Sequence, residues 1–167
     1  MADHTHERER WDQPFISQTN WWSAAASGIR AAFILDAEVH GIIIYDDFAH
    51  HPTAIATTLD GLRKHIGDAP LIAVIEPRSN SMKLGAHRDG LPHSVVQADH
   101  VVWYAPANLG WDLAGTVACS PVPTKVCDSL EAIIAEVKAK VTPGTHVVIM
   151  SNGGFGGLHG KLADALR

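Results

Sequence analysis

Three short runs of apolar residues stand out along the chain, at residues 71–75, 101–104 and 147–150. None of them alternates with polar residues, as a strand with one face in water would. Runs of this length and kind are typical of strands buried on both faces of a parallel sheet. The pattern therefore predicts a sheet that other elements cover on both sides.

Two earlier apolar stretches lie at residues 31–39 and 41–45. They meet at His40-Gly41, a pair that suits a tight turn because glycine tolerates positive φ. We therefore expect the sheet to begin with a β-hairpin.

Helical patterns separate the apolar runs. After Pro52, which suits a first helical turn, apolar residues recur at helical spacing until Gly67 provides a stop. Asp128 and Glu131 match a capping box ahead of a second helix, and residues 158–166 form a short amphipathic one. This alternation predicts an α/β fold: a Rossmann-like, mostly parallel sheet flanked by helices, with an initial hairpin.

The composition is that of an ordinary folded domain, with 46% hydrophobic and 19% charged residues. Residues 1–27 are polar, then aromatic and Ala-rich, and they show no strand pattern. We therefore expect a tail or domain-junction segment over residues 1–27 and one domain over residues 28–167.

Charge and cysteine content restrict the partners and the compartment. The formal net charge of −5 argues against nucleic-acid binding. No apolar run approaches the roughly 20 residues that span a bilayer, and the polar start does not resemble a secretory signal. Cys119 and Cys127 lack the CxxC spacing and are expected to be reduced thiols. These features predict a cytoplasmic protein with no membrane partner.

Ligands of such sheets bind beyond the carboxyl ends of the strands, where three loops are expected. The first loop contains Asp46, Asp47, His50 and His51. Here a carboxylate can accept hydrogen bonds from ribose hydroxyls, and an imidazole can donate to a phosphate near the start of the next helix. Two other interpretations stay open: simple capping of that helix by Asp47 or His51, and a metal site.

The second loop follows the apolar run at residues 71–75. Arg78 is placed there to bind a carboxylate through two hydrogen bonds, and Ser79, Asn80 and Lys83 add donors for a polar ligand. A surface arginine on a turn is the alternative interpretation.

The third loop, residues 151–157, contains four glycines that let the backbone approach a ligand closely. It matches neither the dinucleotide-binding pattern GxGxxG nor the phosphate-binding pattern GxxxxGK[ST]. The loop is therefore interpreted as a backbone platform and not as an independent phosphate site.

Together, the segments YDDFAHHPT, EPRSNSMKLG and MSNGGFGGLHGKL resemble the C-terminal domain of the Mur ligases, in their murein peptide ligase branch. The resemblance implies a parent enzyme that uses ATP and Mg²⁺ to join UDP-N-acetylmuramate to the recycled murein tripeptide L-alanyl-γ-D-glutamyl-meso-diaminopimelate. It also implies N-terminal and central domains that this chain lacks, the central one carrying the P-loop. The chain alone is then expected to be inactive and to bind no cofactor tightly.

Carried onto this sequence, the resemblance implies two sets of contacts, with no catalytic residue and no metal ligand among them. The ATP contacts would be Asp47, His50 and His51. The tripeptide contacts would be Arg78, Ser79, Asn80 and Lys83 from the second loop and Asn152, Gly153, Gly154 and Phe155 from the third.

One segment departs from the family. Its members begin this domain with a basic stretch similar to G-V-K-R-R-x-E-L, whereas residues 28–35 read GIRAAFIL. The loss of two basic residues and an acid puts any interdomain or phosphate contact made there in doubt.

Two rival functions remain open. The first is a small metal-dependent hydrolase that uses Asp46, Asp47, His50 and His51. The second is a non-catalytic regulatory module that uses the same fold to bind a peptide or a nucleotide.

Overall fold

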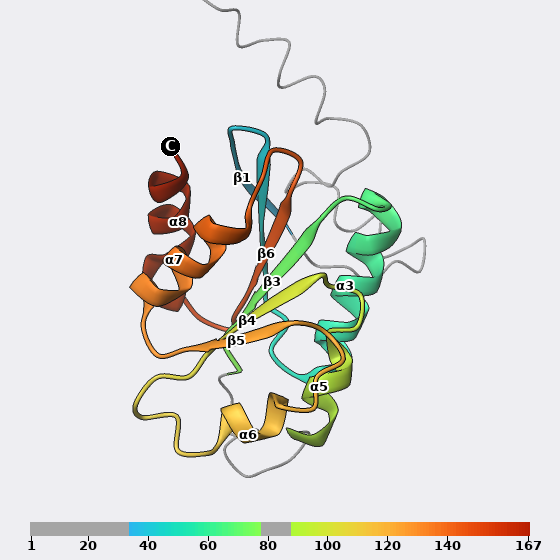
Figure 1. The fold of residues 1–167 in the computed structure, drawn as a ribbon, viewed down its shortest axis with the longest axis vertical. Coiled ribbons are helices and arrows are strands. Elements are labelled where there is room, and N and C mark those ends of the chain that lie inside the picture. The colour runs from blue at the N-terminus through green and yellow to red at the C-terminus, as the bar shows by residue number, and fades with distance from the viewer. Residues whose placement is uncertain (1–33, 78–87) are drawn as a thin grey trace, which may run out of the picture.

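The computed structural model describes residues 34–77 and 88–167. Its centre is a six-stranded sheet in the order β1-β2-β6-β3-β4-β5 (Figure 1). β1 pairs with β2 antiparallel, and all other neighbours are parallel. The strands are β1 Ile34–Val39, β2 Ile42–Asp47, β3 Leu71–Ile75, β4 His100–Tyr104, β5 Thr124–Cys127 and β6 His146–Met150.

Helices cover both faces of this sheet (Figure 1). One face carries α3, Pro52–Ile66, with the short helices α5, Leu91–Ser94, and α6, Leu113–Val117. The other face carries α7, Leu130–Lys140, and α8, Leu158–Leu166. Two 3₁₀ turns, η1 at Arg88–Gly90 and η2 at Phe155–Gly157, complete the described elements. None of the described helices is long and apolar enough to cross a membrane.

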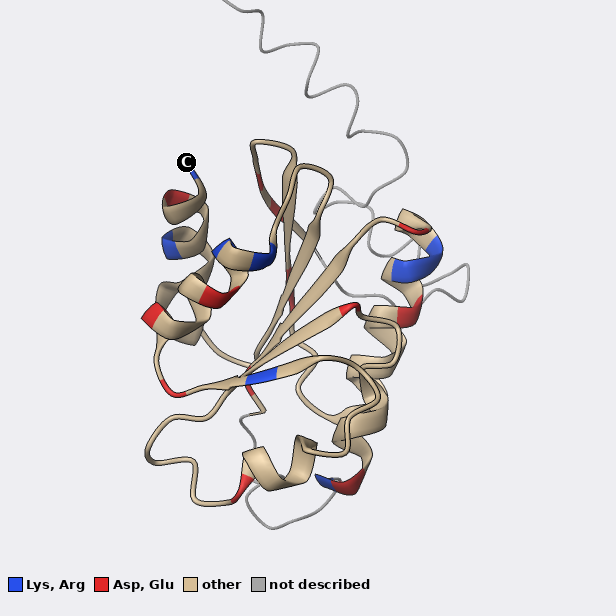
Figure 2. Cartoon of the chain, in the orientation of Figure 1, with Lys and Arg blue, Asp and Glu red and all other residues tan. Residues whose placement is uncertain are grey.

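The central strands explain why the apolar runs show no alternation. In β3, Leu71, Ala73 and Ile75 pack towards α3, whereas Ile72 and Val74 pack towards α7 and α8. Both sets are buried because both faces are covered. Figure 2 agrees, since β3 and β6 carry no Lys, Arg, Asp or Glu along their length.

The α/β prediction is confirmed, including the hairpin and the start and end of α3. His40 and Gly41 both have positive φ, +50° and +79°, as a two-residue hairpin turn requires. Helix α3 begins at Pro52, and the amide of Gly67 closes it on the carbonyl of Arg63.

The predicted cap of α7 was wrong. Ser129, and not Asp128, is the N-cap, and its hydroxyl accepts from the amide of Ala132 at 3.1 Å. The two candidates are adjacent, and the extended backbone at Ser129, with φ −142° and ψ 158°, decided between them.

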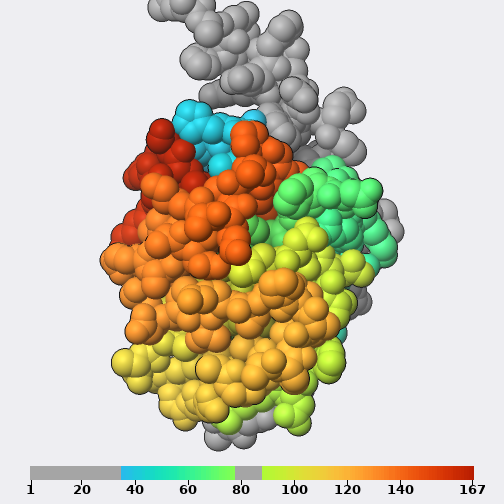
Figure 3. Space-filling model, viewed as in Figure 1, coloured from blue at the N-terminus to red at the C-terminus, as the bar shows by residue number. Residues whose placement is uncertain are grey.

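Strand β5 and helices α5 and α6 are additional to the predicted elements. β5 has four residues, follows two prolines and lies at the edge of the sheet, at the surface in Figure 3. The two helices have four and five residues, too few for a helical repeat to be recognised.

A pair formed by the buried Tyr45 and the partly buried His146 makes the stability of the fold depend on pH. Tyr45 Oη and His146 Nδ1 are hydrogen-bonded at 2.8 Å, and the two rings stack with centroids 5.7 Å apart. Burial lowers the pKa of His146 from its ordinary 6.5, and the charges of His65 and Arg63 add to this. The contribution of His146 is therefore complete above about pH 6.5, and it falls as the pH drops below that value because the unfolded chain binds the proton more readily.

We accordingly expect the free energy of unfolding to fall between pH 7 and pH 5, and to fall less in His146→Gln, which keeps an acceptor but does not titrate. Urea unfolding at both pH values measures the fall in the free energy of unfolding for the parent chain and for the variant. An equal fall in the two proteins would mean that other groups cause the acid sensitivity.

Candidate functional site at the carboxyl ends of the strands

The buried side chain of Asp47 stabilises the loop after β2. This side chain is 3% exposed, and its Oδ1 accepts from the amide of Ala49 at 3.1 Å. Its Oδ2 is closed to solvent and has no hydrogen bond of standard geometry. Burial raises the pKa of Asp47 and outweighs the hydroxyl of Thr58, which favours the ionised form. Asp47 therefore lies beneath the loop that it stabilises.

The two histidines lie above Asp47 at the start of α3, each with one ring nitrogen engaged. His51 is the N-cap of α3, and its Nδ1 accepts from the amide of Ala54 at 3.4 Å. His50 Nδ1 donates to the carbonyl of Phe48 at 2.9 Å. These bonds set the neutral tautomers, so that His50 Nε2 is an acceptor and His51 Nε2 carries a proton. The rings meet edge to face at 5.5 Å and present one acceptor and one donor side by side.

Asp46 points to the other face of the sheet. Its Oδ1 accepts from His159 Nε2, on α8, at 2.9 Å. The two residues are 113 positions apart, and their bond links the loop after β2 to the helix that follows the Gly-rich loop. The two adjacent aspartates therefore have different partners on opposite faces.

A second buried carboxylate, Glu76, directly follows β3. Glu76 is 5% exposed, and its Oε2 accepts from the hydroxyl of Ser151 at 2.6 Å. Ser151 is 3% exposed and lies directly after β6. Its Oγ also accepts from the amide of Gly153 at 3.1 Å. This pair was not predicted from the sequence, although each residue is the first polar residue after an apolar run.

The Gly-rich loop folds back in a left-handed turn. Phe155, Gly156 and Gly157 have φ values of +45°, +59° and +76°. The positive φ of Gly156 favours glycine there, and a Cβ at this position would lie 2.8 Å from Leu130 Cδ1, so the end of that leucine side chain would have to shift. Asn152, Gly153 and Gly154, just before this turn, are exposed.

Phe155 has a different place from its three neighbours in the predicted tripeptide site. It is 3% exposed and stacks on Tyr104, at the end of β4, with ring centroids 5.4 Å apart. Its side chain belongs to the core on the α7–α8 face. The exposed surface of the loop is therefore made by Asn152, Gly153 and Gly154.

The predicted contacts Arg78, Ser79, Asn80 and Lys83 lie outside the described residues. The described chain resumes at Arg88, whose guanidinium lies 4.7 Å from the ring centre of Trp111. The loop after β4 thus contributes an aromatic side chain at the carboxyl end of the sheet, and no sequence motif predicted a role for it.

Metal ligation has no basis in the described ranges. They contain no group of three or more His, Cys, Asp and Glu side chains that could hold an ion. In the proposed hydrolase site, Asp46 and Asp47 diverge, and one nitrogen of each of His50 and His51 is bonded to backbone.

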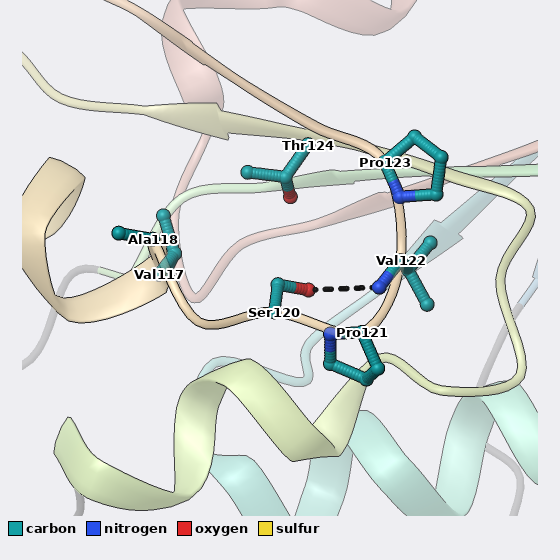
Figure 4. A pocket seen from close by; sticks show the side chains of 7 residues that line it. All are labelled: Val117, Ala118, Ser120, Pro121, Val122, Pro123 and Thr124. Carbon is teal, nitrogen blue, oxygen red and sulfur yellow. Dashed lines mark hydrogen bonds between the residues drawn. The ribbon is translucent and has the colours of Figure 1, made fainter.

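A pocket of about 490 Å³ lies at the other end of the sheet, between α6 and the amino end of β5 (Figure 4). It is lined by Val117, Ala118, Ser120, Pro121, Val122, Pro123 and Thr124. None of these side chains is charged, and the Ser120 hydroxyl already accepts from the amide of Val122 at 3.3 Å. This pocket is separate from the loops described above.

The described residues form an α/β domain, with the loops after β2 and β6 at the carboxyl ends of its parallel strands. Residues 30–153 match the family model described as "Mur ligase, glutamate ligase domain". The chain therefore belongs to the Mur ligase family.

Individual relatives agree with this assignment. The chain is 44% identical over 133 residues to the UDP-N-acetylmuramate–L-alanyl-γ-D-glutamyl-meso-2,6-diaminoheptandioate ligase of Escherichia coli. The aligned residues cover 79% of this chain and 29% of that enzyme. Among solved structures, the murein peptide ligase of Psychrobacter arcticus superposes with a TM-score of 0.73 at 45% identity, over 79% of this chain and 29% of that one.

An isolated domain from a Haemophilus ducreyi protein of the same description matches with a TM-score of 0.70 at 36% identity. The match covers 80% of this chain and 98% of that one, so a domain of this kind has been crystallised on its own. Against curated relatives of full length, this chain spans about 29% of the sequence.

Proposed function

We propose that residues 28–167 are the C-terminal domain of an ATP-dependent ligase that joins UDP-N-acetylmuramate to the murein tripeptide L-alanyl-γ-D-glutamyl-meso-diaminopimelate in the cytoplasm. The observation that carries the proposal is the 44% identity to a ligase of that description over most of this chain. Residues 1–27 would be a tail or domain junction. The N-terminal and central domains would supply the UDP-sugar site, the P-loop and the Mg²⁺ ligands.

The loop after β2 fits an ATP contact. Helix α3 has no acidic residue in its first turn, so nothing on the helix neutralises the partial positive charge of its N-terminus. His50 and His51 present an acceptor and a donor beside that terminus. We propose that these imidazoles contact the nucleotide and that Asp47 holds their loop in place. When bound by the whole enzyme, ATP supplies the phosphoryl group that activates the carboxylate of the sugar.

The amino substrate of the proposed reaction carries several carboxylates, which suit the residue types of the segment after β3. In the proposal, Arg78, Ser79, Asn80 and Lys83 bind those carboxylates, and the exposed backbone of Asn152, Gly153 and Gly154 forms a wall of the site. The buried Phe155 holds that wall against Tyr104.

The first test uses the 167-residue chain. We expect no ATP-dependent ligation by the chain alone, because its sequence carries no P-loop motif. We do expect weak binding of the tripeptide, measured by calorimetry. Arg78→Ala should weaken that binding by about 10- to 100-fold, as expected for loss of a charge-assisted bidentate contact.

Arg167→Ala is the matched control, because Arg167 is an exposed arginine at the end of α8 whose side chain pairs with Asp164, three residues earlier. The affinity of this variant for the tripeptide should equal that of the parent chain. Product formation by the isolated chain would overturn the domain assignment, and unchanged binding in Arg78→Ala would reject the loop after β3. Bound metal that survives dialysis at a stoichiometric level would favour the hydrolase instead.

A further inference from the structure

The Gly-rich loop is held at two points by strands other than its own. At its start, Ser151 donates to Glu76, directly after β3, and four residues later Phe155 stacks on Tyr104 at the end of β4. Side chains alternate along a strand, and the residue before each of Glu76, Tyr104 and Ser151 packs on the α3 side. These three side chains therefore form a row on the α7–α8 side, and the loop lies across that row.

The hydrogen bonds around Ser151, to Glu76 and to the amide of Gly153, have a definite direction. The Ser151 hydroxyl has one proton, and its distance of 2.6 Å to Glu76 is typical of a hydroxyl that donates to a carboxylate. The lone pairs on Ser151 Oγ are then left to accept the amide of Gly153 at 3.1 Å. Glu76 thus orients the hydroxyl, and the hydroxyl holds the backbone of the loop.

We propose that Glu76 and Ser151 are positioning residues for the amino substrate, because they fix the backbone of Asn152, Gly153 and Gly154 before that substrate binds. This inference rests on the proposed function, which assigns that backbone to the tripeptide. Glycine loses more conformational freedom on ordering than any other residue, so a loop that is already ordered binds with less entropic loss.

Stability by itself does not require this pair. A buried carboxylate at the end of a central strand is costly to desolvate, and apolar residues of similar volume often replace such polar pairs without loss of stability. What an apolar pair cannot do is hold the amide of Gly153 in one direction.

The chain offers a matched control at the opposite end of β6. Thr145 is 1% exposed, and its hydroxyl accepts from the amide of Thr142 at 3.0 Å. Ser151→Ala and Thr145→Val each delete one buried hydroxyl that holds a backbone amide. The two hydroxyls lie at opposite ends of the same strand, so only the first variant touches the proposed site.

The test measures the tripeptide Kd by calorimetry and the exchange rate of the Gly153 amide by NMR, in the 167-residue chain. Ser151→Ala should raise the Kd about 10- to 100-fold and speed Gly153 exchange, because misplaced binding groups lose affinity. Ser151→Thr, which keeps the hydroxyl, should restore most of the affinity. Thr145→Val should lower the melting temperature while leaving both readouts unchanged. If Ser151→Ala does not fold, Glu76→Gln, which keeps an acceptor without the charge, should raise the Kd several-fold.

The outcomes separate the two proposals. A parent chain that binds no tripeptide contradicts the proposed function. A parent chain that binds, together with a Ser151→Ala variant whose Kd lies within twofold of it, contradicts the positioning role alone. A Thr145→Val variant that weakens binding as much as Ser151→Ala would also reject that role, since it would trace the effect to general stability.

Discussion

Trp103→Ala is expected to lower the free energy of unfolding by about 3–5 kcal/mol, the cost of removing a large buried aromatic side chain. Trp103 is fully buried in the middle of β4, and its Nε1 donates to Thr124 Oγ1 on β5 at 3.1 Å. The substitution would therefore open a cavity and also break a bond between β4 and the edge strand. Because domains of this size have only about 5–15 kcal/mol of stability, this loss would remove a large share of it.

Urea unfolding followed by circular dichroism measures this effect. Phe48→Ala is the aromatic control, because Phe48 is 68% exposed and its loss should change stability by no more than about 0.5 kcal/mol. The free energy of unfolding of Trp103→Phe should lie between those of Trp103→Ala and Phe48→Ala. A cost below about 1 kcal/mol for Trp103→Ala would mean that the core around β4 is not packed as described.

Arg63→Ala is expected to lower the free energy of unfolding by about 2–3 kcal/mol, because the guanidinium of Arg63 joins three segments of the chain. Its Nε and Nη2 donate to the carbonyl of Gln97 at 3.0 and 2.8 Å, and its Nη1 donates to the carbonyls of Gly67 and Ala69, each at 2.8 Å. Nη2 also pairs with Asp99 at 2.9 Å. The end of α3, the entry to β3 and the entry to β4 are held together in this way.

The neighbouring Lys64 is the control for this prediction. Its side chain is 75% exposed and pairs with Asp60 along the helix, so Lys64→Ala should cost no more than about 0.5 kcal/mol. Arg63→Lys should recover only part of the loss, because an ammonium group cannot reach all these carbonyls at once. Equal unfolding midpoints for Arg63→Ala and Lys64→Ala would contradict the role given to the guanidinium.

Local signals predicted the elements that have strong local causes. The apolar run 71–75 became β3 with the same bounds, and residues 158–166 became α8. β5 was missed because its edge position leaves Lys125 exposed and its strand pattern weak. The cap of α7 was misassigned by one residue because Asp128 and Ser129 are both good caps, and only the backbone geometry separates them.

The candidate site shows the same division. The loop with His50 and His51 was found from its composition, and the role of His51 as a helix cap was one of the alternatives considered. The Glu76–Ser151 and Asp46–His159 bonds were not found, since their partners lie 75 and 113 positions apart. Such pairs depend on the order of the strands, which brings β6 between β2 and β3.

Local patterns were sufficient to predict the class of fold, the positions of its buried strands and the three segments that carry the family's motifs. Periodicity and turn residues specify these features, and they act over a few neighbouring positions. Three other features follow from the packing of the folded domain: Asp46 and Asp47 face opposite sides, Phe155 packs in the core, and Glu76 holds the Gly-rich loop. Each of these depends on which strands lie side by side, and strand order follows from packing of the whole domain rather than from any local pattern.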